Sequence, residues 1–302
     1  MDCRRLHGDK FFGRFVLLLS RPEIEEGGFA LIEAFKKNRL FAIYTAAVIL
    51  ILFVAIFAPY LAPQDPFDGN MRNVLQPPSS EHLLGTDKLG RDTLSRIIAG
   101  TQVSLFMTIC LVILLAIVGS IIGITSGYFG GKVEMILMRF ADMMLAFPGV
   151  VLAIAIAGIL GGSVVNTIIA LLAVGWAKYA RLVRSLVIKL RNNDFIIAAQ
   201  VNGTKTINIL WRHILPNILP MVVITGAMDI GTMMMEIAGL SFLGFGAQPP
   251  TPEWGLMLNE GRQYIQTAPW LMIYPGAAIF IVVATFNLWG DSLRDVLDPR
   301  QQ

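Results

Sequence analysis

Charged residues are scarce in this sequence. Of its 302 residues, 15% are charged and 55% are hydrophobic, whereas soluble domains average about 25% charged residues. The mean hydropathy of +0.65 points the same way. This composition excludes a disordered chain and argues against a cytosolic globular enzyme. It predicts an all-α integral membrane protein.

Cysteine, histidine and nucleotide-binding motifs are also scarce. Cys3 and Cys110 are too few for a disulfide framework. The histidines His7, His82 and His213 are scattered, and no metal-ligand spacing joins them. We therefore expect no metal site, and no other cofactor bound by this chain. The chain has no G-x-x-x-x-G-K-[ST] loop, so we do not expect it to bind ATP itself. A net charge of +3, without basic runs interleaved with aromatics, also argues against nucleic-acid binding.

Long apolar runs predict six membrane spans, because a bilayer core needs about 20 apolar residues of helix. The spans are expected at 40–58, 103–123, 143–161, 164–180, 218–246 and 271–290. They divide the chain into an N-terminal arm (1–39), a first span (40–58), a long loop (59–102), a five-helix transmembrane domain (103–290, with a large loop at 181–217) and a tail (291–302). The third and fourth spans are expected to form a tight hairpin at Gly161-Gly162-Ser163.

The distribution of basic residues predicts the orientation, since cytoplasmic segments retain Lys and Arg. With the N-terminus inside, the inner segments hold 19 of the 24 basic residues. Both termini are therefore expected in the cytoplasm. The arm lacks the long apolar stretch and cleavage site of a signal peptide, so we expect it to remain as a cytoplasmic segment. Lys178, Arg181 and Arg184 are expected at the inner edge of the membrane, where they could reach lipid headgroups.

The large loop, residues 181–217, has the pattern of two short helices separated by a glycine. Asp194 and Thr206 are suitable N-caps, Gly203 can end the first helix, and Pro216 precedes the next span. An ordinary cytoplasmic linker is one interpretation. However, the loop also contains apolar residues that a solvated linker does not need, and exposed apolar patches usually mark an interaction site. They are Phe195, Ile196, Ile197, Ile207, Ile209, Leu210 and Trp211.

Three features of this loop resemble the EAA loop of ATP-binding-cassette importer permeases, which docks on the ATPase subunit. They are Ala198-Ala199, Gly203 four residues later, and His213-Ile214-Leu215-Pro216 ten residues after that glycine. The resemblance implies that residues 181–217 form a coupling loop within a permease domain at 103–290. The sequence departs from the pattern at Ile197, where the family usually has Glu. An acidic contact from that position is therefore in doubt, and Asp194 is a possible substitute.

Other segments are similar to one branch of these permeases, the second membrane subunit of dipeptide, oligopeptide and nickel uptake systems. They are Leu84 to Asp92 (LGTDKLGRD) with Ser95-Arg96, Ala238 to Gly246 (AGLSFLGFG), Pro249 to Gly255 (PPTPEWG) and Phe286 to Asp295 (FNLWGDSLRD). These matches extend from the first loop to the C-terminus, and only the N-terminal arm has none.

This resemblance implies a permease rather than an enzyme, in the cytoplasmic membrane of a bacterium or archaeon. The expected partners are a second homologous permease, two ATPase subunits that use ATP and Mg²⁺, an extracytoplasmic solute-binding protein and membrane lipid. Transport of di- or oligopeptides or nickel by alternating access follows from the same resemblance. The residues expected to couple to the ATPase are Asp194, Ala198, Ala199, Gly203, His213 and Pro216. The residues expected to contact the binding protein are Thr86, Asp87, Arg91, Asp92, Glu253 and Trp254.

Two acids, Asp229 and Glu236, lie within the fifth span. Charged groups at that depth usually face a cavity or a partner, and a spacing of seven residues places both near one helix face. They are candidates for the substrate route, where they would attract a cationic ligand. A structural hydrogen bond or a permanently protonated acid is the alternative. The adjacent Met233, Met234 and Met235 point in different directions and are expected to pack rather than to bind metal.

Two other classes of membrane protein remain as alternatives. An ion-coupled secondary transporter would need coupling-ion sites on broken helices, commonly within an inverted repeat, and no convincing repeat is present. An integral membrane enzyme would need acids, His or Cys gathered at one depth, and none gather.

Overall fold

The computed structural model describes residues 39–297, so the predicted N-terminal arm and the end of the tail lie outside the described residues. The described chain is built of helices, with one isolated β-bridge between Thr86 and Asp92. Its long helices are α3 (Arg39–Leu61), α4 (Thr93–Phe129), α5 (Gly131–Ala146), α6 (Gly149–Leu160), α7 (Val164–Arg191), α10 (Leu215–Phe242) and α12 (Trp270–Leu297). Shorter ones are η1 (Met71–Asn73), α8 (Asp194–Val201), α9 (Thr206–Ile209), the π-helix η2 (Leu210–Ile214), α11 (Trp254–Gly261) and η3 (Arg262–Tyr264).

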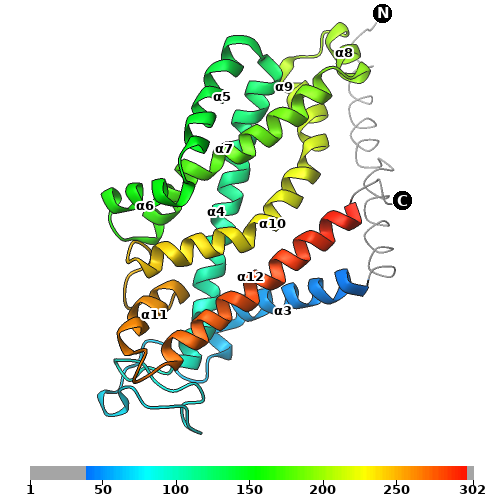
Figure 1. Ribbon diagram of the computed structural model, residues 1–302. Helices are drawn as coiled ribbons and strands as arrows, with labels where there is room; N and C mark the ends of the chain where they lie inside the picture. The colour runs from blue at the N-terminus through cyan, green and yellow to red at the C-terminus, as the bar shows by residue number, and fades with distance from the viewer. Residues whose placement is uncertain (1–38, 298–302) are drawn as a thin grey trace, which may run out of the picture.

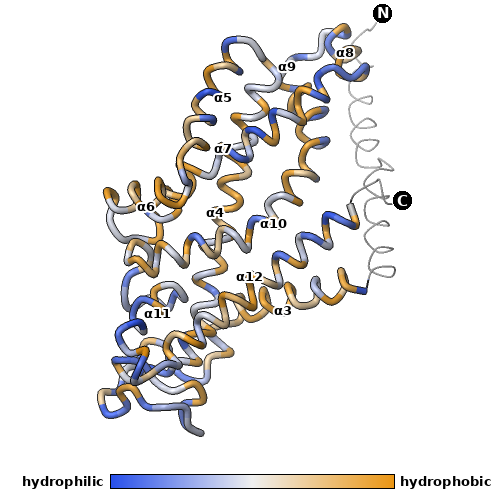
Figure 2. The backbone as a smooth tube through the Cα atoms, in the orientation of Figure 1, coloured by the Kyte–Doolittle hydropathy of each residue, from blue (hydrophilic) through white to orange (hydrophobic). Residues whose placement is uncertain are grey.

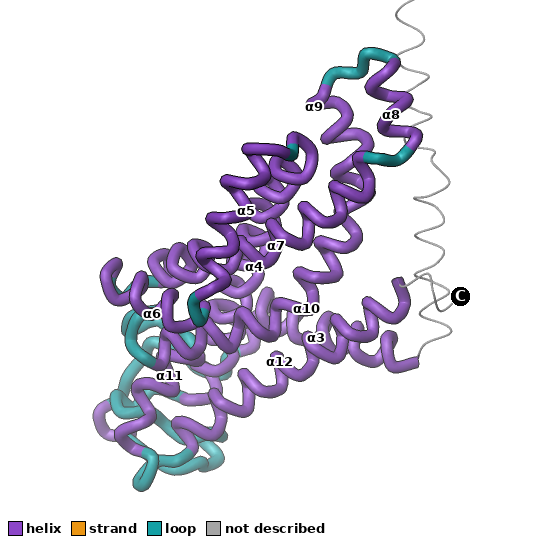
Figure 3. Tube along the Cα trace, turned by 45° about the horizontal axis from the view of Figure 1, so that its top comes forward, coloured by secondary structure: helices purple, strands orange, loops and turns teal. Residues whose placement is uncertain are grey.

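The two ends of this elongated helical assembly differ from its middle. The loop before α4, together with α11, lies at one end, and α8 and α9 lie at the other (Figure 1). Hydrophilic residues are concentrated toward these two ends, while the helices between them are largely apolar (Figure 2). The irregular segments gather at the same two ends (Figure 3). This distribution suits a chain whose helices cross a membrane.

The predicted spans are only partly confirmed. Four described helical segments are long and apolar enough to cross a membrane, or five if the bent pair α5 and α6 counts as one crossing, rather than the six expected. The four are Arg39–Leu61, Thr93–Phe129, Thr206–Phe242 and Trp270–Val296. Helix α7 is long but is not among the helices that are apolar enough to cross a membrane. Its second half carries the basic residues Lys178, Arg181, Arg184, Lys189 and Arg191.

The third predicted span is wrong in its shape. Residues 143–161 do not form one straight helix, because α5 and α6 meet at an angle of 92°. The bend falls at Phe147-Pro148, and Phe147 has the extended backbone that a following proline favours. The segment 124–142, expected to connect two spans, is also helical and is interrupted only at Gly130. Residues 291–297 of the predicted tail likewise continue α12.

A stripe of three glycines brings α4 and α7 into close contact. A Cβ atom added at Gly119 would lie 2.3 Å from Cβ of Tyr179, and one at Gly123 would lie 2.7 Å from the carbonyl oxygen of Ala180. Gly127 continues the stripe against Val187. Small residues at a spacing of four let helix backbones approach each other within a membrane. The largest apolar core forms around this contact, and α8, α9 and η2 are anchored in it by Ile196, Ile209 and Ile214, respectively.

Candidate functional site

The end of the molecule that carries α8 contains the predicted coupling loop. Helix α7 continues to Arg191, so the loop between long helices is shorter than 181–217, and most of it is helical. Arg191 donates hydrogen bonds to the carbonyl oxygens of Gly127 and Tyr128 at 3.2 and 3.1 Å. These bonds fasten the end of α7 to the C-terminus of α4, whose last carbonyls have no partner within the helix.

The turn after α8 confirms the expectation for Gly203. Its φ of +71° lies in the left-handed region that glycine adopts readily. Thr204 N–H donates to the carbonyl of Ala199 at 3.0 Å, and Gly203 N–H donates to that of Gln200 at 2.9 Å. These two bonds form a Schellman motif, which satisfies carbonyls at the helix end. No described atom lies within 4 Å of a Cβ added at Gly203, so this turn faces open space.

The two predicted N-caps of the loop are wrong by one residue. Asn193 caps α8, and Lys205 caps the next helix, while Asp194 and Thr206 are the first helical residues. Neither cap makes a side-chain hydrogen bond to the helix. Asp194 is exposed in the first turn of α8, where a negative charge interacts favourably with the helix dipole.

The apolar residues of the loop divide into an anchored group and an exposed group. Ile196, Ile209 and Ile214 have relative exposures of 0%, 1% and 0% and pack into the core. In contrast, Phe195, Ile197 and Val201 are 43%, 46% and 82% exposed. The α8 surface, which we define as Phe195, Ile197, Ala198 and Val201, is therefore apolar and uncovered among the described residues. Ala198 faces outward, whereas Ala199 packs partly on the core.

His213 and Pro216 lie where the loop joins α10. The rings of Phe195 and His213 have centroids 6.3 Å apart, which links α8 to η2. Asn217 donates to the carbonyl oxygen of His213 at 2.6 Å. Pro216 is exposed near the start of α10. The six predicted coupling residues thus lie along one connected segment, which starts at α8 and ends at the entry of α10.

The three basic residues expected at the inner edge of the membrane pair with acids of the same chain. Lys178 Nζ lies 2.6 Å from Asp229 on α10, and Arg181 lies 2.5 Å from Asp142 on α5. Arg184 pairs with Glu134, also on α5. One face of α7 is therefore linked by ion pairs to the helices on either side of it.

The two acids of α10 differ in their surroundings. Asp229 is 5% exposed, and its partner Lys178 has a side chain that is 58% exposed, so the pair lies at the edge of the bundle. Glu236 is half-buried on the same helix. Among the described residues, no Lys or Arg nitrogen lies within ion-pair distance of Glu236. Asp229 is thus a carboxylate bonded to the neighbouring helix α7, which agrees with the structural alternative for this residue; its partner Lys178 was not predicted.

At the opposite end, charged residues of three segments form a compact group, which we call the α11-end cluster: Asp87, Lys88, Arg91, Arg96 and Glu260. Arg91 contacts Asp87 at 2.6 Å and Glu260 at 3.4 Å. Arg96 lies 3.5 Å from each of the same two acids. Arg96 also donates to the carbonyls of Pro66 and Pro250 at 3.2 and 3.4 Å. The cluster therefore ties the long loop, the start of α4 and α11 into one unit.

The six residues expected to contact a binding protein are buried beneath this end. Their relative exposures are 0% for Thr86, 8% for Asp87, 2% for Arg91, 3% for Asp92, 1% for Glu253 and 2% for Trp254. Such side chains do not form a contact surface themselves. We therefore revise that expectation, because they shape the surface by supporting its backbone.

Two of these buried residues cap helices. Asp92 accepts hydrogen bonds from the N–H and hydroxyl of Ser95 at 2.8 and 2.7 Å, which makes it the N-cap of α4. Glu253 accepts from the N–H groups of Gly255 and Leu256, each at 2.8 Å, at the start of α11. Burial raises the pKa of Glu253 above its ordinary value, while the N–H donors act in the opposite direction.

Comparisons with known proteins agree with this arrangement. Residues 119–302 match the family described as binding-protein-dependent transport system inner membrane component, and residues 31–78 match the N-terminal TM domain of oligopeptide transport permease C.

Curated relatives match nearly the whole chain. The dipeptide transport system permease protein DppC of Alkalihalophilus pseudofirmus is 45% identical, over 89% of this chain and 90% of its own. The nickel transport system permease protein NikC of Escherichia coli is 42% identical, over 83% of this chain and 91% of its own length. The glutathione transport system permease protein GsiD of Pectobacterium atrosepticum is 43% identical, over 84% of each chain.

A solved structure shows a similar fold. An inward-facing structure of the MetNI methionine ABC transporter aligns with a TM-score of 0.54 at 18% identity. The alignment covers 67% of this chain and 97% of that chain. At this identity the likeness concerns the fold alone.

Proposed function

The chain belongs to the binding-protein-dependent transport system inner membrane component family, and from that premise we propose that it carries a peptide or nickel species across the membrane by alternating access. It is a permease component of an ATP-binding-cassette importer, and ATP is hydrolysed on separate subunits. This membership removes the secondary transporter and the membrane enzyme as alternatives.

We propose that two ATPase subunits and a second homologous permease complete the transporter, and that the α8 surface docks on one ATPase. The observation that carries this proposal is the division of apolar residues in the coupling loop. Ile196, Ile209 and Ile214 fix the loop rigidly to the core, while Phe195, Ile197 and Val201 are exposed. An apolar surface held on a rigid anchor can transmit the motion of a partner to α7 and α10.

Asp194, Ala198 and Gly203 have complementary roles in this proposal. Ala198 keeps the exposed surface flat, and Gly203 ends α8 without a side chain that would hold a partner away. Asp194 supplies the acidic group that Ile197 lacks. Ala199, His213 and Pro216 support the segment from beneath and at its junction with α10.

Lys178, Asp229 and Glu236 are our candidates for the substrate route. The Lys178–Asp229 pair leaves little net charge at that point, whereas Glu236 makes no ion pair with a described residue. Glu236 is therefore the better candidate to attract a peptide amino group or a metal cation. The named relatives that carry dipeptides, nickel and glutathione are compatible with such a substrate.

A charge-neutralising series distinguishes a route from a structural pair. Asp229→Asn alone leaves Lys178 unpaired, and Lys178→Gln alone leaves Asp229 unpaired; the double variant leaves neither charge. If the pair is structural, the double variant recovers uptake in reconstituted transporter. If Asp229 contacts the substrate, uptake stays low in both variants that lack it. Glu236→Gln should reduce uptake with normal assembly, and unchanged uptake would remove Glu236 from the route.

We further propose that both termini and α8 are cytoplasmic and that the α11 end faces outward. The binding protein would then meet the loop between α3 and α4 and the loop before α11. The exposed loop residues Phe67 and Leu83 are candidate contacts in place of the six buried ones. Substituting these two with Glu should weaken the binding protein's affinity for the assembled transporter, and an unchanged affinity would oppose the proposal.

A further inference from the structure

His82 is a buried histidine in the loop before α4, and both of its ring nitrogens have a partner. Its relative exposure is 4%. Nδ1 lies 3.1 Å from Oδ1 of Asp92, and Nε2 lies 3.3 Å from Nδ2 of Asn73. Asp92 is the N-cap of α4, and Asn73 is the last residue of η1. The ring therefore connects the turn η1 to the start of α4.

Two groups that can only accept hydrogen bonds fix the protons of this network. At one end, the carboxylate of Asp92 requires a proton on Nδ1 of His82. At the other end, Nε2 of Gln76 donates to the carbonyl oxygen of Arg72 at 3.4 Å and to Oδ1 of Asn73 at 3.3 Å. The amide of Asn73 therefore turns its donor, Nδ2, toward the ring. Nε2 of His82 has to accept this bond, so the network fits a neutral imidazole with its proton on Nδ1.

A second proton on His82 breaks this network at one place. An N–H on Nε2 faces the NH₂ group of Asn73, and two donors cannot bond each other. At Nδ1, in contrast, a charged ring pairs more strongly with Asp92. The Asp92 contact is therefore kept, and the conflict falls on Asn73. If the Asn73 amide rotates to accept from the ring, its NH₂ group faces the donor of Gln76, and that bond is lost.

Few charges surround the ring. Among the described acids, Asp92 lies within ion-pair distance of it. Glu81, directly before His82, and Arg72, directly before Asn73, are exposed, so solvent screens them. The charges of the α11-end cluster pair with one another. Imidazole takes up a proton between about pH 5 and 8, where these other groups keep their charge.

From this geometry we infer that His82 is an acid-sensitive switch of the loop between α3 and α4. At neutral pH the ring holds η1 through Asn73. In acid the protonated ring stays on Asp92 and releases Asn73 and Gln76. Met71 of the same turn is 75% exposed, so the release changes the surface of this end. The inference goes beyond the proposed function and does not depend on the substrate. With the α11 end facing outward, as proposed, the switch responds to the pH on the outer side of the membrane.

Hydrogen exchange of the complete transporter, purified in detergent with its partner subunits, tests this inference. It is measured at about pH 7.5 and about pH 5.5, on either side of histidine titration, with labelling times scaled to the chemical exchange rate at each pH. Two amides report on η1. Asn73 N–H donates to the carbonyl of Asn70 at 2.8 Å, and Leu75 N–H donates to that of Asp87 at 3.1 Å. We expect protection in 70–76 to fall about tenfold in acid, as loss of roughly one hydrogen bond gives.

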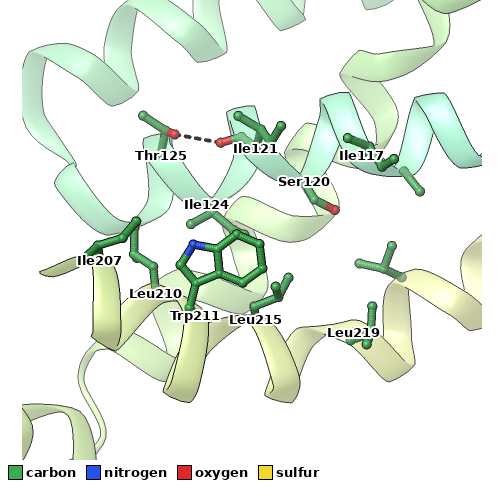
Figure 4. Close-up of a pocket in the computed structure, with 12 residues that line it drawn as sticks. Ile117, Ser120, Ile121, Ile124, Thr125, Ile207, Leu210, Trp211, Leu215 and Leu219 are labelled. Atoms are coloured by element: carbon green, nitrogen blue, oxygen red, sulfur yellow. Dashed lines mark hydrogen bonds between the residues drawn. The ribbon is translucent and has the colours of Figure 1, made fainter.

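Two other segments serve as internal references. Arg96 N–H donates to the carbonyl of Asp92 at 3.1 Å and should keep its protection, because the protonated ring stays on Asp92. Residues 116–125 of α4 should also be unaffected. The apolar groove that they form with Trp211 and Leu215 is lined by no titratable side chain among the described residues (Figure 4).

Three variants assign the response to His82. His82→Gln offers one donor and one acceptor in place of the ring but takes up no proton, so protection of 70–76 should be the same at both pH values. His213→Gln, at the opposite end of the molecule, is the matched control and should keep the acid response. Asn73→Asp places a carboxylate against Nε2, which bonds the protonated ring. It should reverse the sign, so that 70–76 exchange more slowly in acid.

Three results would overturn the inference. Equal protection of 70–76 at both pH values in the unaltered chain would show that there is no switch. An acid response that persists in His82→Gln would assign it to another group. Loss of protection that extends to Arg96 would show that acid loosens the whole end rather than η1. Asn73→Asp keeps the test decisive if His82→Gln disturbs folding, because an unreversed sign in this variant would also contradict the inference.

Discussion

The two ends of this permease differ in which side chains are buried and which are exposed. At the α11 end, five charged residues satisfy one another, and Arg96 is 1% exposed. At the α8 end, large apolar side chains such as Phe195 and Val201 are exposed, and few polar contacts hold the helix. The charged cluster of the first end is closed within the chain, whereas the exposed apolar α8 surface has the character of half an interface. The comparison predicts that mutations in the α11-end cluster change folding and that mutations on the α8 surface change coupling.

The largest effect is expected from Arg96→Met at the α11 end. The variant leaves Asp87 and Glu260 without one of their cations and removes the donor to the carbonyls of Pro66 and Pro250. Loss of one member of a buried ionic network costs about 3 to 5 kcal/mol. We expect a strongly lowered melting temperature and little assembled transporter.

The matched control is Lys88→Met, at the rim of the same cluster, where the lysine side chain is 36% exposed. An exposed ion pair contributes at most about 1 kcal/mol. Equal melting temperatures for the two variants would contradict the view that burial makes this cluster a folding element.

Two adjacent residues of α8 provide the next test. Ile196→Ala removes a fully buried side chain and should cost about 2 to 5 kcal/mol of stability. Ile197→Ala, at a residue that is 46% exposed, should change stability by about 0.5 kcal/mol or less. It should instead weaken binding of the ATPase subunit, up to about tenfold in Kd if Ile197 is a main contact.

Thermal unfolding and binding of purified ATPase subunit to the reconstituted permease measure the two effects separately. If Ile197→Ala lowered stability as much as Ile196→Ala, the division into anchored and exposed residues would be wrong. If Ile197→Ala left ATPase binding unchanged while Phe195→Ala reduced it, the interface would be smaller than the α8 surface defined here.

Much of the α8 end was predictable from the sequence, but the α11 end was predictable only in part. The Gly203 turn follows from local backbone chemistry, and Asp92 follows from the pattern of an N-cap. The α11-end cluster joins Asp87 to Glu260, which lie far apart in sequence, so no local pattern indicates it. Pro148 is a local signal for the bend between α5 and α6, which the predicted span 143–161 does not include. The repeat of Gly119, Gly123 and Gly127 is likewise a local signal, and it indicates the close contact of α4 with another helix.

Two of the glycines with open turns allow a smaller and more specific test. Gly203 and Gly161 both have positive φ, +71° and +84°, and at each an added Cβ meets no described atom within 4 Å. Substitution by Leu imposes the same kind of backbone strain at both, about 1 to 2 kcal/mol. Only Gly203 lies beside the α8 surface.

Gly203→Leu should therefore reduce transport while the ATPase subunits still hydrolyse ATP, and Gly161→Leu should leave the ratio of substrate carried to ATP hydrolysed unchanged. Both rates are measured in proteoliposomes at matched protein content. An unchanged ratio in Gly203→Leu would contradict the proposed docking role of this turn.

The smallest expected effect concerns Glu253. Because burial raises its pKa in the folded state, the folded protein holds this proton more tightly than the unfolded chain does. The contribution of Glu253 to stability therefore decreases as pH rises from the ordinary Glu pKa of about 4.3 toward its raised pKa in the folded state. Glu253→Gln should make the melting temperature less dependent on pH in this range, and an unchanged pH profile would contradict the assignment.

The central claim is that the α8 surface lies in the cytoplasm and is covered by an ATPase subunit. It is tested most directly with a single cysteine at Ala198, introduced after Cys3 and Cys110 are replaced, and a membrane-impermeant maleimide. We expect labelling only in inside-out vesicles stripped of ATPase, and strong protection when purified ATPase subunits are added back. Labelling in right-side-out vesicles, or labelling that the added ATPase does not change, would contradict the account.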